Sequence, residues 1–286
     1  MISSHRYLYK WVAAFICRHV RKNKGSTRSV GNLLSALKRC SILEGVPWMT
    51  KKDELKLMGT ISQLKLEDLS PSRRKRSLRA VELVQIIDVL DLSDDKQLLK
   101  AVMLATGHDG LLRTAELLFG SKVNNILWEF DRKSFRYELP RSKTHRSGEL
   151  EYITYCDYGP YSAVRLMKMW FDRHGLWSKP YVNVFPAVSR SGKLDFSRVP
   201  SGSWWRKVIK TCCASIGLDS TRYSGHSLRA GGATDLFVAR VPYYIIKKMG
   251  RWKSDAAMLY YRDDEDIRDA VTEAFTNLYK VYANVK

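Results

Sequence analysis

The sequence predicts a mainly α-helical α+β fold with a small antiparallel β-sheet, divided into two domains. The chain has 286 residues, enough for two domains, and its 45% hydrophobic content is typical of globular proteins. Apolar residues recur at helical spacing along most of the chain, whereas residues 122–155 contain segments that alternate as strands do. A Pro/Ser/basic stretch at residues 69–78 separates the two parts.

Residues 1–68 form the first predicted domain, which is helical and strongly basic. Apolar stripes at helical spacing predict a succession of helices, the last of them at residues 53–64. Up to Lys52 the only acidic residue is Glu44. We expect the stripes to form a core and the basic faces to bind a polyanion. The candidate contacts in this domain are Arg18, Arg21, Lys22, Lys24, Lys38 and Arg39.

Residues 69–78 (LSPSRRKRSL) are interpreted as a basic linker. A solvated charged linker is the simplest interpretation. A segment laid across nucleic-acid phosphates and a nuclear localisation patch are two functional interpretations, and the sequence does not separate them. The candidate contacts here are Arg73, Arg74, Lys75 and Arg76.

Residues 79–286 form the second predicted domain, in which buried helices surround the sheet. Apolar runs predict helices at residues 81–90 and 98–105, before the strands. The predicted strands are residues 122–130, 133–139 and 149–155. Helices are predicted again at residues 161–174, 203–216 and, by an apolar stripe after an acidic start, 265–283.

The net charge restricts the partners of this chain. Lys and Arg number 49 against 29 Asp and Glu, a formal net charge of +20. Such an excess is self-repulsive unless a polyanion neutralises it, so we expect nucleic acid as the partner. A merely soluble basic protein and one that touches anionic membranes are the alternatives. No apolar run reaches 18 residues, and we expect no membrane role.

The five cysteines are odd in number, irregularly spaced and without a CxxC pair. They suggest neither a disulfide framework nor a zinc site, so we expect no metal and reduced thiols in an intracellular protein. The N-terminus lacks a charged region followed by an apolar core, so we expect no secretory signal.

A constellation in the second domain suggests chemistry at a phosphate. His226 and Arg229 stand three apart at the start of a helical pattern, followed by Trp252 and Tyr260. Arg229 offers a fixed fork of donors, His226 a donor or proton carrier, and a phenol can attack as the nucleophile. Each member alone has an ordinary structural explanation: His226 could be a capped histidine of the core, Trp252 could be a packing residue, and Tyr260 is one of 15 tyrosines.

Two earlier residues extend this constellation and are equally ambiguous alone. Arg113 could simply pair with Glu116 at i,i+3, and Lys143 could be a solvated hairpin residue. The ordered set is far more specific than its members. Its segments are Ala105-Thr106-Gly107, Leu112-Arg113-Thr114-Ala115-Glu116-Leu117, Ser142-Lys143-Thr144, His226-Ser227-Leu228-Arg229-Ala230-Gly231-Gly232-Ala233-Thr234, Gly250-Arg251-Trp252, Ser254-Asp255-Ala256 and Tyr260-Tyr261-Arg262.

In this order, the segments resemble the catalytic domain of the tyrosine recombinases, the phage-integrase superfamily. The resemblance extends from Arg79 to Arg262, whereas residues 1–68 resemble the family's helical core-binding domain only in composition, position and helix pattern. The Gly-Arg-Trp segment resembles the variant of eukaryotic mobile elements such as crypton-type and DIRS-type elements. The turn between Gly107 and Arg113 is longer than in the family pattern.

The resemblance implies catalytic roles for these residues. Arg113 and Arg229 would hold the non-bridging oxygens of the scissile phosphate, with His226 as hydrogen-bond donor or proton carrier. Lys143, on a mobile hairpin, would protonate the departing 5′ oxygen, and Tyr260 would attack.

Two further roles and two alternatives follow from the same resemblance. Glu116 would support the site from behind, and Trp252 would support the phosphate or pack the nucleophile's helix. Many relatives have the His or aromatic residue directly after the glycine, where this chain has Arg251. The nucleophile could also be Tyr261, but the usual glycine-to-tyrosine offset of ten selects Tyr260.

The resemblance also implies an activity and an assembly. The expected protein is a two-domain DNA clamp: a site-specific recombinase or integrase, encoded by a mobile element, that cuts double-stranded DNA through a 3′-phosphotyrosyl intermediate without metal or cofactor. We expect a homotetramer on two DNA sites, with helix 265–283 either docked into a neighbouring protomer or packed on its own core. In a eukaryotic host the compartment would be the nucleus. The alternatives are type IB topoisomerase-like activity and a catalytically silent, domesticated DNA-binding protein.

Overall fold

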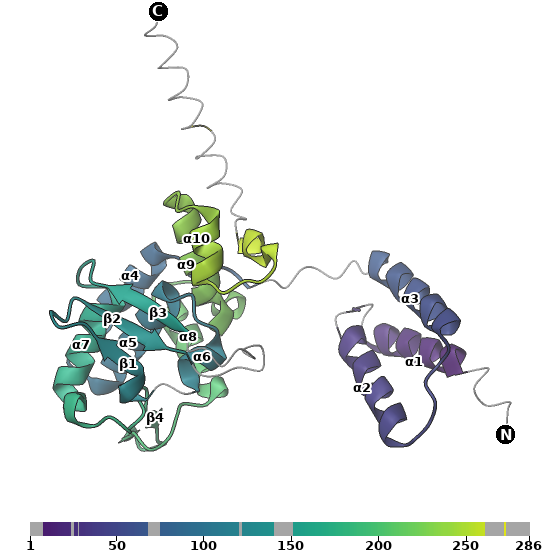
Figure 1. Ribbon diagram of the computed structural model, residues 1–286, viewed down its shortest axis with the longest axis horizontal. Coiled ribbons are helices and arrows are strands. Elements are labelled where there is room, and N and C mark those ends of the chain that lie inside the picture. The colour runs from purple at the N-terminus through teal and green to yellow at the C-terminus, as the bar shows by residue number, and fades with distance from the viewer. Residues whose placement is uncertain are drawn as a thin grey trace, which may run out of the picture. The chain divides into compact units, whose positions relative to one another are not determined.

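The chain divides into two compact units, residues 1–73 and 74–286 (Figure 1). The computed structural model describes residues 8–23, 26–27, 29–67, 75–119, 122–139, 151–260 and 272. The division lies inside the segment 69–78. Of the predicted helix 265–283, only Thr272 is among the described residues, and it is helical.

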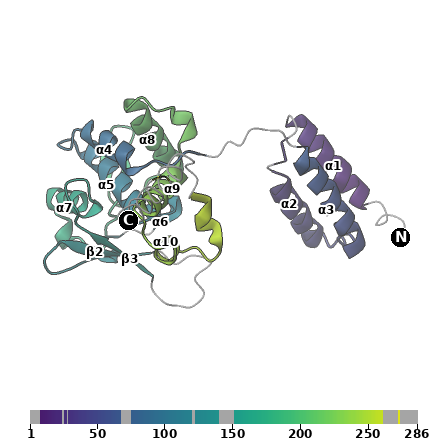
Figure 2. The same cartoon turned by 90° about the horizontal axis from the view of Figure 1, so that it is seen from above.

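The described part of unit 1 consists of helices α1, α2 and α3, which pack as a bundle (Figure 2). Their bounds are Leu8–Lys22, Val30–Leu43 and Lys51–Leu66. Their apolar stripes meet in a small core of Val12, Ile16, Val20, Val30, Met49, Leu57 and Ile61. The Thr50 side chain caps α3 by accepting from the Asp53 amide at 3.2 Å, which explains why this helix begins before the predicted residue 53.

Unit 2 begins with helices and then adds strands. Its first elements are α4 (Ala80–Asp88), α5 (Asp95–Asp109), α6 (Thr114–Leu118), η2 (Val123–Asn125), β1 (Ile126–Trp128), β2 (Ser134–Glu138) and β3 (Tyr152–Cys156). The elements that follow are α7 (Ala163–His174), η3 (Leu176–Ser178), β4 (Ala187–Val188), β5 (Leu194–Asp195), α8 (Gly202–Ser215), η4 (Ser220–Arg222), α9 (Gly225–Val238), α10 (Tyr243–Met249) and η5 (Asp255–Tyr260).

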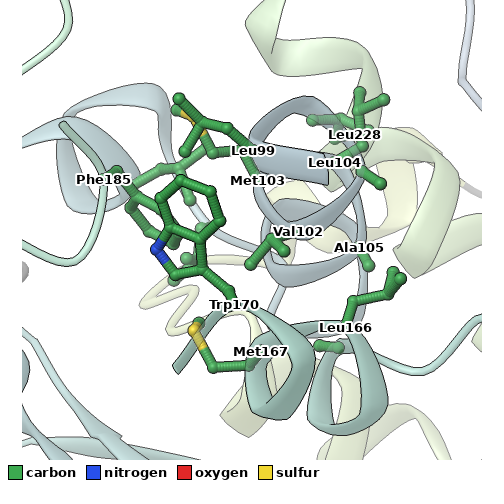
Figure 3. Packing of buried hydrophobic residues seen from close by; sticks show 14 of the residues in the cluster. Leu99, Val102, Met103, Leu104, Ala105, Leu166, Met167, Trp170, Phe185 and Leu228 are labelled. Atoms are coloured by element: carbon green, nitrogen blue, oxygen red, sulfur yellow. The ribbon is translucent and has the colours of Figure 1, made fainter. Parts of the chain in front are cut away.

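Helix α5 is the central element of unit 2, and it is buried on nearly all of its faces. Residues 101–107 of α5 are all buried, so the helix is surrounded rather than amphipathic. Figure 3 shows its side chains between those of α7, such as Trp170, and Leu228 of α9. Trp170 is fully buried, and its indole N–H donates to the Val184 carbonyl at 2.8 Å. This packing fixes α9, which carries His226 and Arg229, against α5.

The predicted antiparallel sheet is confirmed, with the strand order β1-β2-β3 among the described residues. Phe135 of β2 faces Trp128 of β1 and Tyr155 of β3 across the register. The Phe135 and Tyr155 rings stack with their centroids 4.6 Å apart. A second hairpin, β4–β5, was not predicted, because two-residue strands leave no alternating pattern to detect.

The end of the predicted linker is an integral part of unit 2. Arg76 donates its amide to the Arg222 carbonyl at 2.8 Å, and Leu78 donates to the Ser227 carbonyl at 2.9 Å. Leu78 is fully buried, and a Cβ on Gly231 would lie only 1.7 Å from the Leu78 carbonyl oxygen. This backbone strap, residues 75–79, therefore lies directly on α9, where only a glycine leaves room for it.

None of the helices in the described part of the chain is long and apolar enough to cross a membrane.

Candidate functional site

His226 and Arg229 lie on the first turns of α9, as the sequence predicted. Ser224 precedes the helix and forms a capping box with Ser227, whose hydroxyl accepts from the Ser224 amide at 3.0 Å. A Cβ on Gly225 would lie 2.2 Å from the Thr114 hydroxyl oxygen, so the start of α9 packs directly against the start of α6. The ends of two helices that carry motif residues are thereby brought together.

Arg229 is buried, with 1% of its surface exposed. Its guanidinium donates to the Leu111 carbonyl at 2.6 Å and to the Gly250 carbonyl. It also lies 4.2 Å from the centroid of the Trp252 ring, a cation–π distance. These contacts hold the guanidinium in one orientation, and neutral carbonyls do not cancel its charge.

Arg113 is more accessible, because its side chain is 49% exposed. It is the N-cap residue of α6, and its amide donates to the Glu116 carboxylate at 2.7 Å. Its guanidinium binds the other carboxylate oxygen of Glu116 at 2.5 Å. The predicted i,i+3 pair is confirmed, and it leaves the Arg113 side chain half open to solvent.

Arg251 is a third arginine of this cluster, and its side chain is only 6% exposed. It binds the Glu116 carboxylate at 2.6 Å and donates to the Leu111 carbonyl at 3.1 Å. It also donates to the Met249 carbonyl at 2.6 Å. Sequence reasoning had noted Arg251 only as the residue that displaces Trp252 by one position, so this pairing was missed.

Trp252 lies against the glycine of its own turn. A Cβ on Gly250 would fall 1.7 Å from the Trp252 ring, so only glycine allows this contact. The side chains of Arg251 and Trp252 point to different partners, because the backbone of Arg251 is left-handed, with φ of 56°. As a result Arg251 reaches Glu116 while Trp252 covers Arg229.

The electrostatics of the site reflect these close charges. Partial burial, and then the charges of Arg229 and Arg113, lower the pKa of His226 from its ordinary value of 6.5. Burial alone would raise the pKa of Glu116, but the Arg251 charge and the hydrogen bonds from Arg113 lower it below 4.5. At neutral pH the site therefore holds a neutral His226 and an ionised Glu116.

An open pocket of about 690 Å³ lies beside this cluster. The described residues that line it are mostly cationic, with Glu151 as the acidic member. They are Arg113, Glu151, Tyr244, Lys247, Lys248, Arg251, Trp252, Lys253 and Ser254. The lysines of α10 and the turn after it were not among the predicted site residues, because exposed lysines are common on any basic chain. Together they make a pocket that suits a phosphodiester.

The structure describes the backbone position of the predicted nucleophile, Tyr260. Tyr260 is the last residue of η5, which packs against α9 and α10. Lys143 and the alternative nucleophile Tyr261 lie outside the described residues. The structure therefore brings together Arg113, Glu116, His226, Arg229 and Trp252, and adds Arg251.

The predicted DNA contacts of the first domain and the linker are distributed over both units. Among the described ones, every member is exposed, although Lys38 also pairs with Glu54 at 3.0 Å. They are Arg18, Arg21, Lys22, Lys38, Arg39, Lys75 and Arg76. Lys24, Arg73 and Arg74 lie outside the described residues.

Behind the site, a partly buried ionic network ties α9 to α5 and to Arg79, the residue before α4. Asp235 accepts from His108 at 3.0 Å and from the Arg79 guanidinium at 2.5 Å. The other ring nitrogen of His108 lies 3.1 Å from Asp109. Among the described residues, no three His, Cys, Asp or Glu side chains gather in a way that could hold a metal ion.

Comparisons with known proteins identify the fold. No family model matches the sequence, and no curated protein matches it either. Solved structures do: the XerA recombinase has a TM-score of 0.51 at 12% identity, covering 93% of this chain and 98% of that one. The Tn1549 transposon integrase in complex with a circular intermediate DNA has a TM-score of 0.54 at 12% identity, covering 95% and 86%.

A third solved structure matches a smaller part of both chains. The XerH site-specific recombinase bound to its difH substrate has a TM-score of 0.52 at 14% identity, and it matches 69% of this chain. This chain spans about half of that protein, 53% of its length. At such identities the likeness establishes the fold, and the chain has the fold of these recombinases and integrases.

Proposed function

We propose that this chain is a DNA strand transferase of the tyrosine recombinase type, a site-specific recombinase or integrase from a mobile element. The observation that carries the proposal is the convergence of Arg113, His226 and Arg229 in one positive field beside a cation-lined pocket. The fold shared with XerA supports it. The likeness to a transposon integrase bound to DNA supports double-stranded DNA as the substrate and a mobile element as the origin.

The proposed reaction is a transfer of a phosphodiester to a phenol. The Tyr260 oxygen attacks the scissile phosphorus and passes its proton to the neutral His226 or to water, a 3′-phosphotyrosyl bond forms, and the bond from phosphorus to the 5′ oxygen breaks. Lys143 gives that oxygen its proton. A free phenol titrates near pH ~10, so it needs a positive field to react at neutral pH. The reverse attack by a 5′ hydroxyl rejoins the strand with no external energy.

The arginines supply the field at the point where negative charge develops. Losing one such donor typically costs on the order of 3–4 kcal/mol of transition-state stabilisation. Their planar forks are fixed in advance by Glu116 and by backbone carbonyls, so little reorganisation is needed during the reaction. Positive charge is thus provided by side chains, and we propose that cleavage needs no metal ion.

The proposed assembly places DNA between the two units as a clamp, with protomers joined in a tetramer on two sites. The chain has 49 Lys and Arg but only 29 Asp and Glu, and this excess of positive charge supports a clamp around DNA. Strand exchange needs two duplexes and therefore more than one protomer, whereas simple relaxation of supercoils does not.

The test is a suicide-substrate assay with nicked duplexes, in which the cut strand cannot be rejoined. The purified full chain is incubated with candidate sites in the presence of EDTA, and covalent adducts are resolved on a denaturing gel. Tyr260→Phe and Tyr261→Phe are a matched pair, because each removes one hydroxyl from adjacent tyrosines. We expect an adduct from the wild type and from Tyr261→Phe, and none from Tyr260→Phe.

Other outcomes distinguish the alternatives. Loss of the adduct only in Tyr261→Phe would keep the reaction and move the nucleophile by one residue. Adducts that need Mg²⁺ would contradict metal independence. Adducts without exchange between two sites, together with relaxation of plasmid, would indicate topoisomerase-like activity. Tight DNA binding without any adduct on a broad set of sites would indicate a silent DNA-binding protein.

A further inference from the structure

We propose that Arg251 is a positioning residue of the reaction: through Glu116 it holds the Arg113 guanidinium in the orientation that receives the scissile phosphate. This inference rests on the function proposed above. Arg251 stands directly after Gly250, where a His or aromatic residue is expected. The inference explains what an arginine does at that position.

The first argument is the shared carboxylate. Glu116 binds Arg251 at 2.6 Å through one oxygen and the Arg113 guanidinium at 2.5 Å through the other. Arg113 is half exposed and Arg251 almost fully buried. A flexible arginine is thus fixed by a carboxylate that is itself fixed from the interior.

The second argument is the shared backbone. The Leu111 carbonyl accepts from Arg229 at 2.6 Å and from Arg251 at 3.1 Å. Arg251 also donates to the Met249 carbonyl, at 2.6 Å. Leu111 directly precedes the segment that leads to Arg113, and it has a left-handed φ of 48°. Arg251 therefore joins the turn before Arg113 to the turn that follows α10, and a lysine could not make these contacts at once.

The third argument is electrostatic. Burial favours a neutral Glu116, and the charge of Arg251 opposes burial most strongly, followed by the hydrogen bonds and charge of Arg113. Among the residues that the structure describes, two phenols also lie near Glu116: Tyr155 of β3, whose pKa is raised by burial, and Tyr137 of β2, whose hydroxyl donates to the Glu116 carbonyl. Tyr155 therefore stays uncharged between pH 5 and 8. Without Arg251, Glu116 would take up a proton at a higher pH and release its hold on Arg113.

The experiment is a pH profile of adduct formation on the suicide substrate, between pH 5 and 8.5, with the full chain. The variants are Arg251→Gln, Arg251→Lys and the double variant Arg251→Gln/Glu116→Gln. The matched control is Lys253→Gln, which removes a positive charge from the same pocket without touching Glu116. Thermal unfolding and DNA affinity are measured for each variant, so that loss of fold is recognised.

We expect Arg251→Gln to lower the adduct rate by about 10- to 100-fold at neutral pH. Its rate should fall further toward acidic pH, because Glu116 now protonates there. The double variant should also be slow, but its rate should not fall further toward acidic pH, because it has no Glu116 to protonate. Arg251→Lys should be slow as well, without the additional fall at acidic pH. Lys253→Gln should weaken DNA binding and leave the shape of the profile unchanged.

A uniform loss of rate at every pH, or an acid dependence that persists in the double variant, would overturn the inference. So would wild-type rates in a folded Arg251→Gln. Failure of the wild type itself to form adducts would instead contradict the proposed function, and with it any role of Arg251 in cleavage. The two failures are therefore distinguishable within one assay.

Discussion

The three arginines of the site differ in exposure, and this difference separates their roles. Arg113 is half open to solvent, whereas Arg229 and Arg251 are buried. The buried pair is held by backbone carbonyls and, for Arg251, by the Glu116 carboxylate. In the proposed reaction, contact with the phosphate would therefore fall first to Arg113 and His226, and the buried arginines would shape the field around them.

His108 carries a second kind of charge, one that titrates. Burial would lower its pKa, but the hydrogen bonds and charges of Asp109 and Asp235 outweigh burial and raise the pKa to about 9. His108 is therefore protonated in the folded protein at neutral pH, and the ionic network behind α9 depends on that proton.

We predict that the stability of unit 2 falls as pH rises from about 6.5 to about 9. The folded state holds the His108 proton more tightly than the unfolded state, so the contribution is complete below the unfolded pKa and disappears above the folded one. Its size is on the order of 3 kcal/mol. The measurement is urea unfolding of the full chain at pH 6 and pH 9.5.

The control for this prediction is His108→Gln, which can hydrogen-bond to Asp235 but does not titrate. Its free energy of unfolding should be lower at pH 6 and should change less between the two pH values than that of the wild type. An equal pH dependence in both proteins would show that another group is responsible.

At the scale of elements, α9 is held by close backbone contacts as well as by side chains. A Cβ at Gly231 would meet the Leu78 carbonyl, and one at Gly232 would lie 2.3 Å from the His108 carbonyl oxygen. Two consecutive glycines in the middle of a helix cost helical stability, on the order of 1 kcal/mol each. Here they allow the strap and the end of α5 to approach the helix axis.

We predict that Gly231→Ala destabilises unit 2 by about 2 kcal/mol, although alanine is the better helix former. The strap would have to move off α9, and the Leu78–Ser227 hydrogen bond would lengthen or break. The measurement is the urea midpoint of the full chain. Gly202→Ala is the matched control, since a Cβ there meets nothing within 4 Å, and it should be neutral or stabilising. Equal midpoints for the two variants would contradict the close-contact argument.

The sequence predicted those elements whose pattern is local. The helix predicted at residues 161–174 appears as α7, Ala163–His174, two residues shorter because the Ser162 hydroxyl caps it by accepting from the Arg165 amide at 3.2 Å. The Arg113–Glu116 pair was predictable because its members are three residues apart. The β4–β5 hairpin was not, because its strands are too short to show a period.

The rest of the site depends on contacts between distant parts of the chain. Arg251 and Glu116 are 135 residues apart, and His108 and Asp235 are 127 residues apart. No spacing rule connects such residues, and without the fold each is one charged side chain among many. The identities of the motif residues were readable from the sequence, but the partners that orient them were not.

At the scale of the whole molecule, charge is the dominant feature, and it bears on how the proposed DNA substrate would be held. Each phosphate contact made by a Lys or Arg releases condensed counterions, so affinity should fall steeply with salt. The exposed basic residues at the end of α1, Arg18, Arg21 and Lys22, are candidates for such contacts.

We predict that replacing Arg18, Arg21 and Lys22 by Gln together weakens DNA binding and makes it less dependent on salt. Three lost phosphate contacts would reduce the slope of log affinity against log salt by up to about 2.7. Fluorescence anisotropy of a labelled duplex between 50 and 200 mM salt measures both quantities. The control is Lys56→Gln, whose ammonium already pairs with Asp53 at 3.2 Å and should contribute little. A slope unchanged in the triple variant would remove the end of α1 from the DNA contacts.

The strap also determines how mechanical load enters unit 2. A pull on the chain from its N-terminal side would be borne by the backbone hydrogen bonds of the strap, from Arg76 to Arg222 and from Leu78 to Ser227. Ser227 lies between His226 and Arg229, so the same tension is delivered to the turn of α9 that carries both. Beyond it, the ion pair between Arg79 and Asp235 acts as the next anchor along the same helix. The point where the connection to unit 1 is tied down is therefore the end of α9 that carries His226 and Arg229.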